Sequence, residues 1–333
     1  MSPTPHLTLR PALAPSRRSV SLGLAMAMCG VFAGAGGAHA EAAPKDLRID
    51  WATYNPVSIV LKNQGLLEKE FAKDGTRITW VQSAGSNKAL EFLNAGSIDL
   101  GSTAGAAALV AKINGNPIKS IYAYSRPEWT ALVTKNDAIK SVADLKGKRV
   151  AVTRGTDPHI FLVRALQSVG LTEKDVTLVL LQHADGKSAL VRGDVDAWAG
   201  LDPMMASAEI EEGAKLFFRN AAANTWGVLN VSEEFAKKHP ETVKRVIKIY
   251  EQARVWSIAN PDKLKADFVA ATKLPAAVVA KQIDERTALK ESKIAPAREA
   301  ILEAGLALQK AGVIKADVNV KGVVDSLLDS SFH

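Results

Sequence analysis

Short runs of apolar and β-branched residues alternate along the chain with longer runs in which apolar positions recur every three or four residues. The short runs predict strands and the longer runs predict helices. Strands are expected at residues 47–53, 77–82, 98–102, 117–125, 131–134, 150–153, 176–181, 195–200 and 226–231. Helices are expected at 56–71, 87–94, 141–145, 160–169, 186–192, 204–211, 233–237, 241–258, 261–272, 276–283, 296–311 and 320–328. A further Ala-rich helix is expected to end near residue 114.

The turn at residues 154–158 shows what such a strand-to-helix junction offers. Gly155 can adopt a positive φ, Thr156 or Asp157 can cap the helix, and Pro158 suits its first turn. The start of a helix presents free backbone N–H groups and a partial positive charge, so a small anion can bind there. The same pattern also fits an ordinary capped turn.

The alternation predicts an α/β protein with mostly parallel sheets covered by helices on both sides. A repeated sequence pattern favours two similar halves. The segments Gly96-Ser97-Ile98-Asp99 and Gly193-Asp194-Val195-Asp196 each lead from a helix into a short strand. We expect a first lobe at residues 44–128 and 228–333 and a second at 129–227. Opposed strand ends would then surround a ligand in a cleft between the lobes.

Residues 1–40 are expected to form an export signal. Three arginines precede a run of small and apolar residues, and Ala38-His39-Ala40 has the form of a signal-peptidase site, which predicts cleavage after Ala40 and a periplasmic location. Twin-arginine export and the general secretory route both stay open. The net charge of +7 includes these three arginines, which leaves +4 for the mature chain. This mild charge, spread along helices, does not indicate nucleic-acid binding.

Three segments carry a resemblance to a known family. Residues 94–101, 140–151 and 193–198, the last followed by Asp202-Pro203, resemble the periplasmic sulfonate-binding proteins of ABC importers, a group that also binds taurine and nitrate. The resemblance implies a two-lobe periplasmic binding protein fold of type II that closes on its ligand and delivers it to a membrane permease. It also implies ligand-facing loops, which correspond here to Thr53-Tyr54-Asn55, Ser83-Ala84-Gly85, Ser102-Thr103-Ala104, Gly155-Thr156-Asp157 and the turn at Asp202.

A sulfonate has three acceptor oxygens and no proton to donate, so it needs only hydrogen-bond donors. Hydroxyl, amide and backbone N–H groups of these loops can supply them, although each hydroxyl also suits a helix cap. We expect Arg154 and Arg126 either to add a charge-assisted hydrogen bond to the ligand or to stay solvated. For Asp202, the role of a helix cap is favoured over contact with an amine of the ligand. If Asp202 or Glu128 faced the cleft, an amino-sulfonate would fit as the ligand. We expect the aromatic side chains either to line the organic tail of the ligand or to pack within the protein; they are those of Trp129, Trp226 and Tyr54.

Signatures of catalysis are missing from the sequence. Residues 101–105 resemble a nucleophile elbow but have Thr103 where the serine should be, and no clustered Cys/His spacing indicates a metal. His159 is expected at the surface. We therefore expect a monomeric binding protein for a small organosulfonate anion, without enzymatic activity, cofactor, metal or nucleic-acid partner. Taurine, nitrate or an aromatic sulfonate stay open as ligands, as do an exported enzyme on the same scaffold and a sensor partner of a membrane receptor.

Overall fold

Two five-stranded sheets organise residues 43–332, the part of the chain described by this computed structural model. The predicted signal lies outside the described residues. The first sheet has the order β2-β1-β3-β10-β4, and β10 runs antiparallel to both of its neighbours. Its strands are β1 (Asp46–Trp51), β2 (Arg77–Gln82), β3 (Leu100–Ala104), β4 (Ile118–Ser125) and β10 (Gly227–Ser232).

The second sheet repeats this arrangement with the order β7-β6-β8-β5-β9. Here β5 is the strand that runs antiparallel to both neighbours, while β6 pairs in parallel with β7 and β8. The strands are β5 (Thr130–Thr134), β6 (Arg149–Val152), β7 (Thr177–Leu180), β8 (Ala197–Leu201) and β9 (Lys215–Phe218). The predicted similarity of the two halves is therefore present in their strand order.

The chain passes between the sheets twice, from β4 to β5 and from β9 to β10. The expected turn at residues 126–129 is the first of these crossings. The expected α/β class with helices flanking the sheets is confirmed, but the sheets are mixed rather than mostly parallel, because β10 and β5 each run antiparallel to both neighbours. The lobe boundaries stay a prediction. The helices between the strands are α1 (Pro56–Asn63), α2 (Leu66–Phe71), α3 (Ser86–Asn94), α4 (Gly105–Ile113), α5 (Asp157–Ser168), α6 (His183–Arg192) and α7 (Met204–Glu212).

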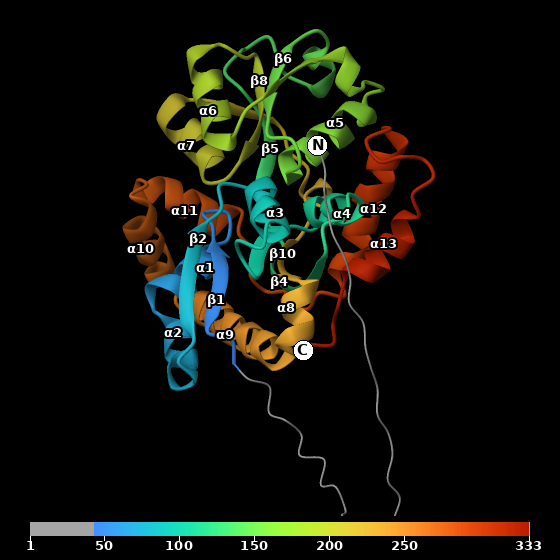
Figure 1. Cartoon of the computed structure of the whole chain (residues 1–333). Coiled ribbons are helices and arrows are strands. Elements are labelled where there is room, and N and C mark those ends of the chain that lie inside the picture. Colours follow the sequence, from blue (N-terminus) through green and yellow to red (C-terminus); the bar gives the residue numbers. More distant parts are fainter. Residues whose placement is uncertain (1–42, 333) are drawn as a thin grey trace, which may run out of the picture. The chain divides into compact units, whose positions relative to one another are not determined.

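Six further helices follow β10 (Figure 1). Proline occupies the first turn of α9 and α10, where no N–H is needed for the helix. Helix α9 packs on α1 and α12 packs on α4, while α11 and α12 also contact α7 and α5 of the second sheet. They are α8 (Glu233–Lys238), α9 (Pro240–Ala259), α10 (Pro261–Thr272), α11 (Ala276–Glu285), α12 (Ala297–Lys310) and α13 (Val320–Leu327).

Two predicted helices differ from the structure, and one strand was not predicted. The helix expected over residues 56–71 is two helices, because Gly65 adopts a φ of 60° and ends the first of them. Strand β9 was not predicted, since its four residues, Lys215–Phe218, form an edge strand that pairs only with β5. Residues 142–145 form a 3-10 helix rather than an α-helix.

Candidate ligand-binding site

The first loop expected to face the ligand is held by bonds within the protein. Asn55 caps α1 by accepting from the N–H of Ser58 at 3.3 Å, and its amide donates to the hydroxyl of Tyr250 at 3.0 Å. The hydroxyl of Tyr54 donates to the carbonyl of Ser102 at 2.9 Å. All of these side chains are buried. Asn55 therefore caps α1, a role that was not expected for it.

The hydroxyls at the end of β3 are also engaged by the protein. The hydroxyl of Ser102 donates to the carboxylate of Asp50 at 3.0 Å, which also accepts the N–H of Ser102 at 2.8 Å. Thr103 accepts from the amide of Asn230 at 2.8 Å, and the N–H of Ala104 donates to a hydroxyl at the start of α3. Burial raises the pKa of Asp50 to about 7 in spite of these hydrogen bonds. The expectation that Ser102 is a free donor is wrong.

The start of α3 is different because no side chain caps it. Gly85 is its N-cap residue, and a side chain there would meet Nε2 of His183 and Oδ1 of Asn87, each 2.8 Å from the position of a Cβ atom. Oδ1 of Asn87 is buried and has no hydrogen-bond partner in the described residues. The buried hydroxyl of Ser83 lies beside the carboxyl of Asp50, and its hydrogen bonding lowers the pKa of that carboxyl. Open polar groups from the protein therefore surround the N-terminus of this nine-residue helix.

The start of α5 also lacks a side-chain cap. Thr156 is the N-cap residue as expected, but its hydroxyl donates to the carbonyl of Thr153 at 2.6 Å instead of capping the helix. Asp157 is fully buried and accepts from Nε1 of Trp129 at 2.8 Å and from the hydroxyl of Thr225 at 2.6 Å. Its carboxylate thus joins α5 to both crossings, and its oxygens are already satisfied.

Gly155 and Arg154 have different surroundings at this turn. Gly155 has the expected positive φ of 77°, and a Cβ atom there would lie 3.9 Å from Cβ of Asn87 on α3. The side chain of Arg154 is 57% exposed and lies 3.9 Å from Glu173. It lines a surface pocket of about 750 Å³ between α5 and the end of α12. Arg154 is therefore solvated, which was one of its two expected roles.

His183, which was not singled out from the sequence, lies at the start of α6. Its side chain is fully buried, and no side chain caps the helix. Nδ1 lies 3.2 Å from the hydroxyl of Thr153, which donates its hydrogen to the carbonyl of Leu181 at 2.7 Å. Nδ1 must then carry the proton and donate to Thr153, which leaves Nε2 as an acceptor without a partner. Burial lowers the pKa of His183 to about 3, so the ring is neutral.

These contacts bring three helix starts together. We call this region the seam and define it by Ser83, Gly85, Asn87, Gly155 and His183. Helix α3 belongs to the first sheet and α5 and α6 to the second, and none of the three is capped by a side chain. Each carries about half a positive charge and unfilled N–H donors at its start. The seam therefore combines donors from both halves of the chain.

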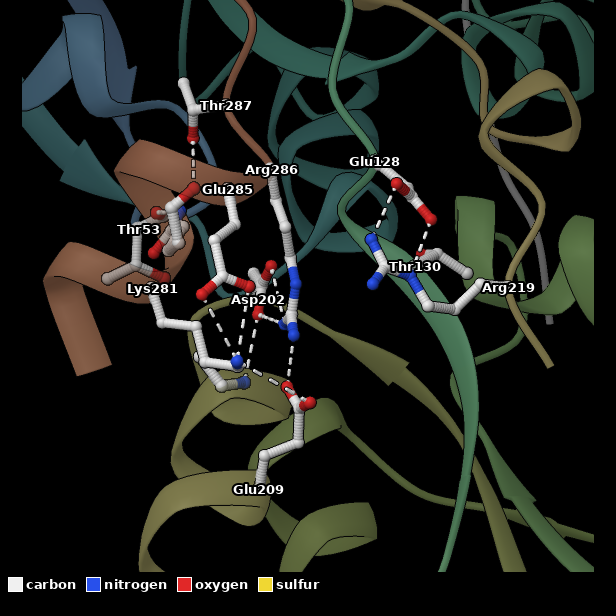
Figure 2. Close-up of polar contacts among 12 residues, drawn as sticks. Thr53, Glu128, Thr130, Asp202, Glu209, Arg219, Lys281, Glu285, Arg286 and Thr287 are labelled. Carbon is white, nitrogen blue, oxygen red and sulfur yellow. Dashed lines mark hydrogen bonds and ion pairs between the residues drawn. The ribbon is translucent and has the colours of Figure 1, made fainter. Parts of the chain in front are cut away.

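Asp202, which follows β8, forms a buried ion pair with Arg286. Figure 2 shows Arg286, which follows α11, between Asp202 and Glu209. The Asp202–Arg286 pair is 2.9 Å long, and both side chains are only 1% exposed. Asp202 also accepts the N–H of Ala206 at 3.0 Å, which is the helix-cap role expected for it. Burial raises the pKa of Asp202 to about 7 even though Arg286 lowers it.

Glu128 and Thr53 complete the contacts near the crossings. Glu128 accepts both hydrogen bonds of a two-pronged pair with Arg219, each 2.8 Å long (Figure 2). The carbonyl of Thr53 accepts from Nε2 of Gln282 at 3.0 Å, so α11 also holds the first loop. Neither Glu128 nor Asp202 presents an unpaired carboxylate to the seam, which removes the expected partner for a ligand amine.

The aromatic residues near the crossings are packed. The ring of Trp129 meets that of Tyr54 edge to face with centroids 6.1 Å apart, and Arg126 lies over Trp226 at 5.6 Å. His159 is 4% exposed and lies 2.9 Å from Glu173, so the prediction that it lies at the surface is wrong. Within residues 43–332 no cluster of His, Cys, Asp or Glu could hold a metal ion, and no helix could cross a membrane.

Two sheets joined by two crossings, with helix starts from both meeting at one seam, define the periplasmic binding protein fold of type II. The family described as NMT1/THI5 like matches residues 69–264, more than half of the chain. The chain therefore belongs to this family.

Similar proteins agree with this assignment. A protein of Escherichia coli (strain K12) named for the binding of aliphatic sulfonates is 32% identical over 252 residues, which are 74% of this chain and 78% of that protein. The structure of the alkanesulfonate-binding protein SsuA from Xanthomonas axonopodis pv. citri, bound to MOPS, matches with a TM-score of 0.78 and 27% identity, over 86% of this chain and 99% of that one. The resemblance seen in the sequence is confirmed.

An enzyme also shares part of the sequence. The 4-amino-5-hydroxymethyl-2-methylpyrimidine phosphate synthase of Uromyces fabae is 30% identical over 165 residues, which are 49% of this chain and 47% of the enzyme. The two binding proteins match over a much larger share of the chain. The scaffold itself therefore does not exclude enzymatic activity, whereas the broader likeness is to binding proteins.

Proposed function

We propose that this chain is the substrate-binding component of an ABC importer and that it holds an organosulfonate anion at the seam. The observation that carries the proposal is the meeting of three uncapped helix starts, those of α3, α5 and α6, which come from both sheets. Backbone N–H groups and helix dipoles at such starts stabilise an anion without any titratable side chain.

The chemistry of the seam suits a sulfonate group. A sulfonate stays a monoanion at physiological pH and accepts several hydrogen bonds, so it is matched by fixed donors that carry no full charge. Each helix start contributes about 0.3–1 kcal/mol, and up to about 2 kcal/mol where it is partly buried. Three of them in a closed, buried site are enough to select an anion over a neutral ligand.

The structure changes which of the expected residues we assign to the ligand. Ser83, Gly85, Gly155 and the backbone of Thr156 stay in the site, and Asn87 and His183 join them. The others, which are engaged by protein groups or exposed, support the seam from outside: Thr53, Tyr54, Asn55, Ser102, Thr103, Ala104, Glu128, Trp129, Arg154, Asp157, Asp202 and Trp226.

Lobe movement would give the ligand access to this buried seam. Open and closed forms that differ by a few kcal/mol suffice, because an anion held by α3 on one side and by α5 and α6 on the other stabilises only the closed form. A permease that recognises the closed form would then import the ligand selectively. In this proposal the mature chain begins after Ala40, acts as a monomer in the periplasm, and needs neither cofactor nor metal.

A thermal-shift panel tests the proposal. Ethanesulfonate, butanesulfonate, sulfate and nitrate are added to the mature chain at increasing concentration. A ligand at 100 times its Kd adds about 2.7 kcal/mol to the free energy of unfolding, which raises the Tm by several degrees. A shift with the alkanesulfonates and not with nitrate or sulfate is expected. A panel in which no sulfonate shifts the Tm would refute the proposal.

A second measurement separates binding from catalysis. The proposed function requires that a sulfonate incubated with the protein is recovered unchanged, and mass spectrometry of the mixture measures this directly. Turnover of any bound sulfonate would favour the enzyme alternative, for which the described residues offer no paired nucleophile and base at the seam.

A further inference from the structure

The neighbours of His183 at the seam make its Nε2 atom a hydrogen-bond acceptor, and no protein group donates to it. Nε2 of His183 is fully buried and has no partner. A buried acceptor without a partner costs about 1–3 kcal/mol, so a group in this state is normally satisfied by a ligand or by water. Because a Cβ atom on Gly85 would be 2.8 Å from Nε2, the atom lies directly beside the start of α3.

The contacts of His183 set its tautomer. The hydroxyl of Thr153 has one hydrogen and places it on the carbonyl of Leu181, at 2.7 Å. The same oxygen can then only accept from Nδ1 of His183, at 3.2 Å. With the proton on Nδ1, the nitrogen that faces the seam offers a lone pair.

A second protonation of this ring is opposed by its surroundings. The pKa of His183 is lowered by burial, and no acidic residue contributes to counter this effect. The positive ends of α3 and α6 disfavour a further positive charge at the same place. His183 therefore presents a neutral acceptor, whereas the neighbouring helix starts present donors.

Carboxylates near the seam cannot receive a positive group of the ligand either. Asp202 is paired with Arg286, and Glu128 with Arg219. Asp157 accepts from Trp129 and Thr225, and Asp50 accepts from Ser102. Asp157 and Asp50 have no cationic partner, but neutral protein donors already bond to their oxygens. A buried ammonium on the ligand would thus compete with these donors, and a buried charge without an ion pair of its own is costly.

We propose that His183 determines the specificity of the site by accepting a hydrogen bond from an uncharged donor on the ligand, so that the preferred ligand is a short sulfonate with a hydroxyl group. This inference rests on the proposed function and narrows its ligand. Helix starts hold the sulfonate, and Nε2 beside α3 accepts from a hydroxyl a few ångströms away. A plain alkanesulfonate leaves Nε2 unsatisfied, and an amino-sulfonate buries a charge without a partner.

Three two-carbon sulfonates test this inference, because they differ only in the group at the second carbon. Isothermal titration calorimetry of the mature chain compares ethanesulfonate, 2-hydroxyethanesulfonate and 2-aminoethanesulfonate (taurine). The hydroxy compound is expected to bind about tenfold more tightly than ethanesulfonate and at least tenfold more tightly than taurine. Equal or tighter binding of ethanesulfonate or taurine would overturn the inference and leave the proposed function standing. If none of the three binds, the proposed function itself fails.

A variant of His183 shows whether this residue is responsible. In His183→Phe the ratio of the two affinities, hydroxy compound to ethanesulfonate, is expected to fall from about ten to about one. His159→Gln is the matched control, because His159 is also buried but bonds to Glu173 away from the seam, and its ratio should stay at about ten. A ratio that persists in His183→Phe would overturn the inference.

Titrations in two buffers with different heats of ionisation test the protonation of the ring. Asp50 and Asp202, whose pKa values are both about 7, also titrate between pH 6 and pH 8, so the wild type is compared with His183→Phe. Proton uptake on binding is expected to be the same in both proteins, because His183 stays neutral and acts as an acceptor. Uptake that is lower by close to one proton per bound ligand in His183→Phe would mean that the ring becomes charged and donates to the sulfonate instead, which contradicts the proposed role.

Discussion

Replacing Arg286 tests how much the buried ion pair beside the seam contributes to stability. Arg286 and Asp202 are 2.9 Å apart and each is 1% exposed, so neither charge can be hydrated after its partner is removed. The variants are Arg286→Met, Asp202→Asn and the double variant. Arg286 follows α11 and Asp202 follows β8, so the pair also joins a C-terminal helix to the second sheet.

The size of the effect follows from this burial. Removing one partner of a buried ion pair costs about 3–5 kcal/mol, because the remaining charge has no partner. That is a large part of a typical free energy of unfolding of about 5–15 kcal/mol. The double variant removes both charges, so we expect it to be more stable than the sum of the two single losses predicts, by about 2 kcal/mol or more.

The pH dependence of Arg286→Met has a definite sign. The pKa of Asp202 is about 7 in the folded protein, against about 3.9 in an unfolded chain. The folded state therefore holds the proton more strongly, and stability falls as the pH rises from about 4 through the folded pKa. Without Arg286 this pKa rises further, so the loss in the variant is larger at pH 8 than at pH 5.

Urea unfolding of the wild type and the three variants at both pH values measures these effects. Free energies of the single variants that add up to that of the double variant would refute the idea that the two charges act as a pair. A loss in Arg286→Met that is the same at pH 5 and pH 8 would show that the removal of Arg286 does not raise the pKa of Asp202.

Two further predictions concern Asp50 and the seam. Asp50→Asn removes a buried carboxyl whose pKa is raised to about 7, so the stability of this variant relative to the wild type should rise by about 3 kcal/mol between pH 5 and pH 8 in urea unfolding. No rise would show that the pKa of Asp50 is not raised in the folded protein. Gly85→Ala places a Cβ atom 2.8 Å from Nε2 of His183 and should weaken sulfonate binding at least tenfold by calorimetry. The control Arg154→Ala, at a side chain that is 57% exposed, should change the affinity less than twofold. A larger effect of Arg154→Ala than of Gly85→Ala would indicate that the anion binds at Arg154.

Local pattern predicted most helices and strands but could not predict how strands join a sheet. Strand β2 has the expected bounds, and α10 coincides with its prediction. Strand β10 was expected as a strand, yet its antiparallel position between β3 and β4 depends on partners about a hundred residues earlier in the chain. Strand β9 was missed because four residues at a sheet edge carry too little periodicity to stand out.

Side-chain type at a turn did not predict which hydrogen-bond donors the protein leaves free. Thr156 and Ser102 were both expected to donate to a ligand, but their hydroxyls bond to Thr153 and Asp50. His183 had a usable signal, since it follows a predicted strand and is the first residue of a helix, as Asp157 is in α5. It was missed because its helix was expected to begin only at Gly186.

Helices α3 and α4 show why an open helix start cannot be recognised from sequence alone. Both follow strands of the first sheet at small residues, and neither is capped by its own N-cap side chain. In α4, however, the N–H of Gly105 donates to the carbonyl of Trp226, and that of Ala106 donates to the hydroxyl of Thr225. The second crossing, about 120 residues later, thus supplies acceptors for the donors of α4, whereas those of α3 are donors that we propose bind the anion.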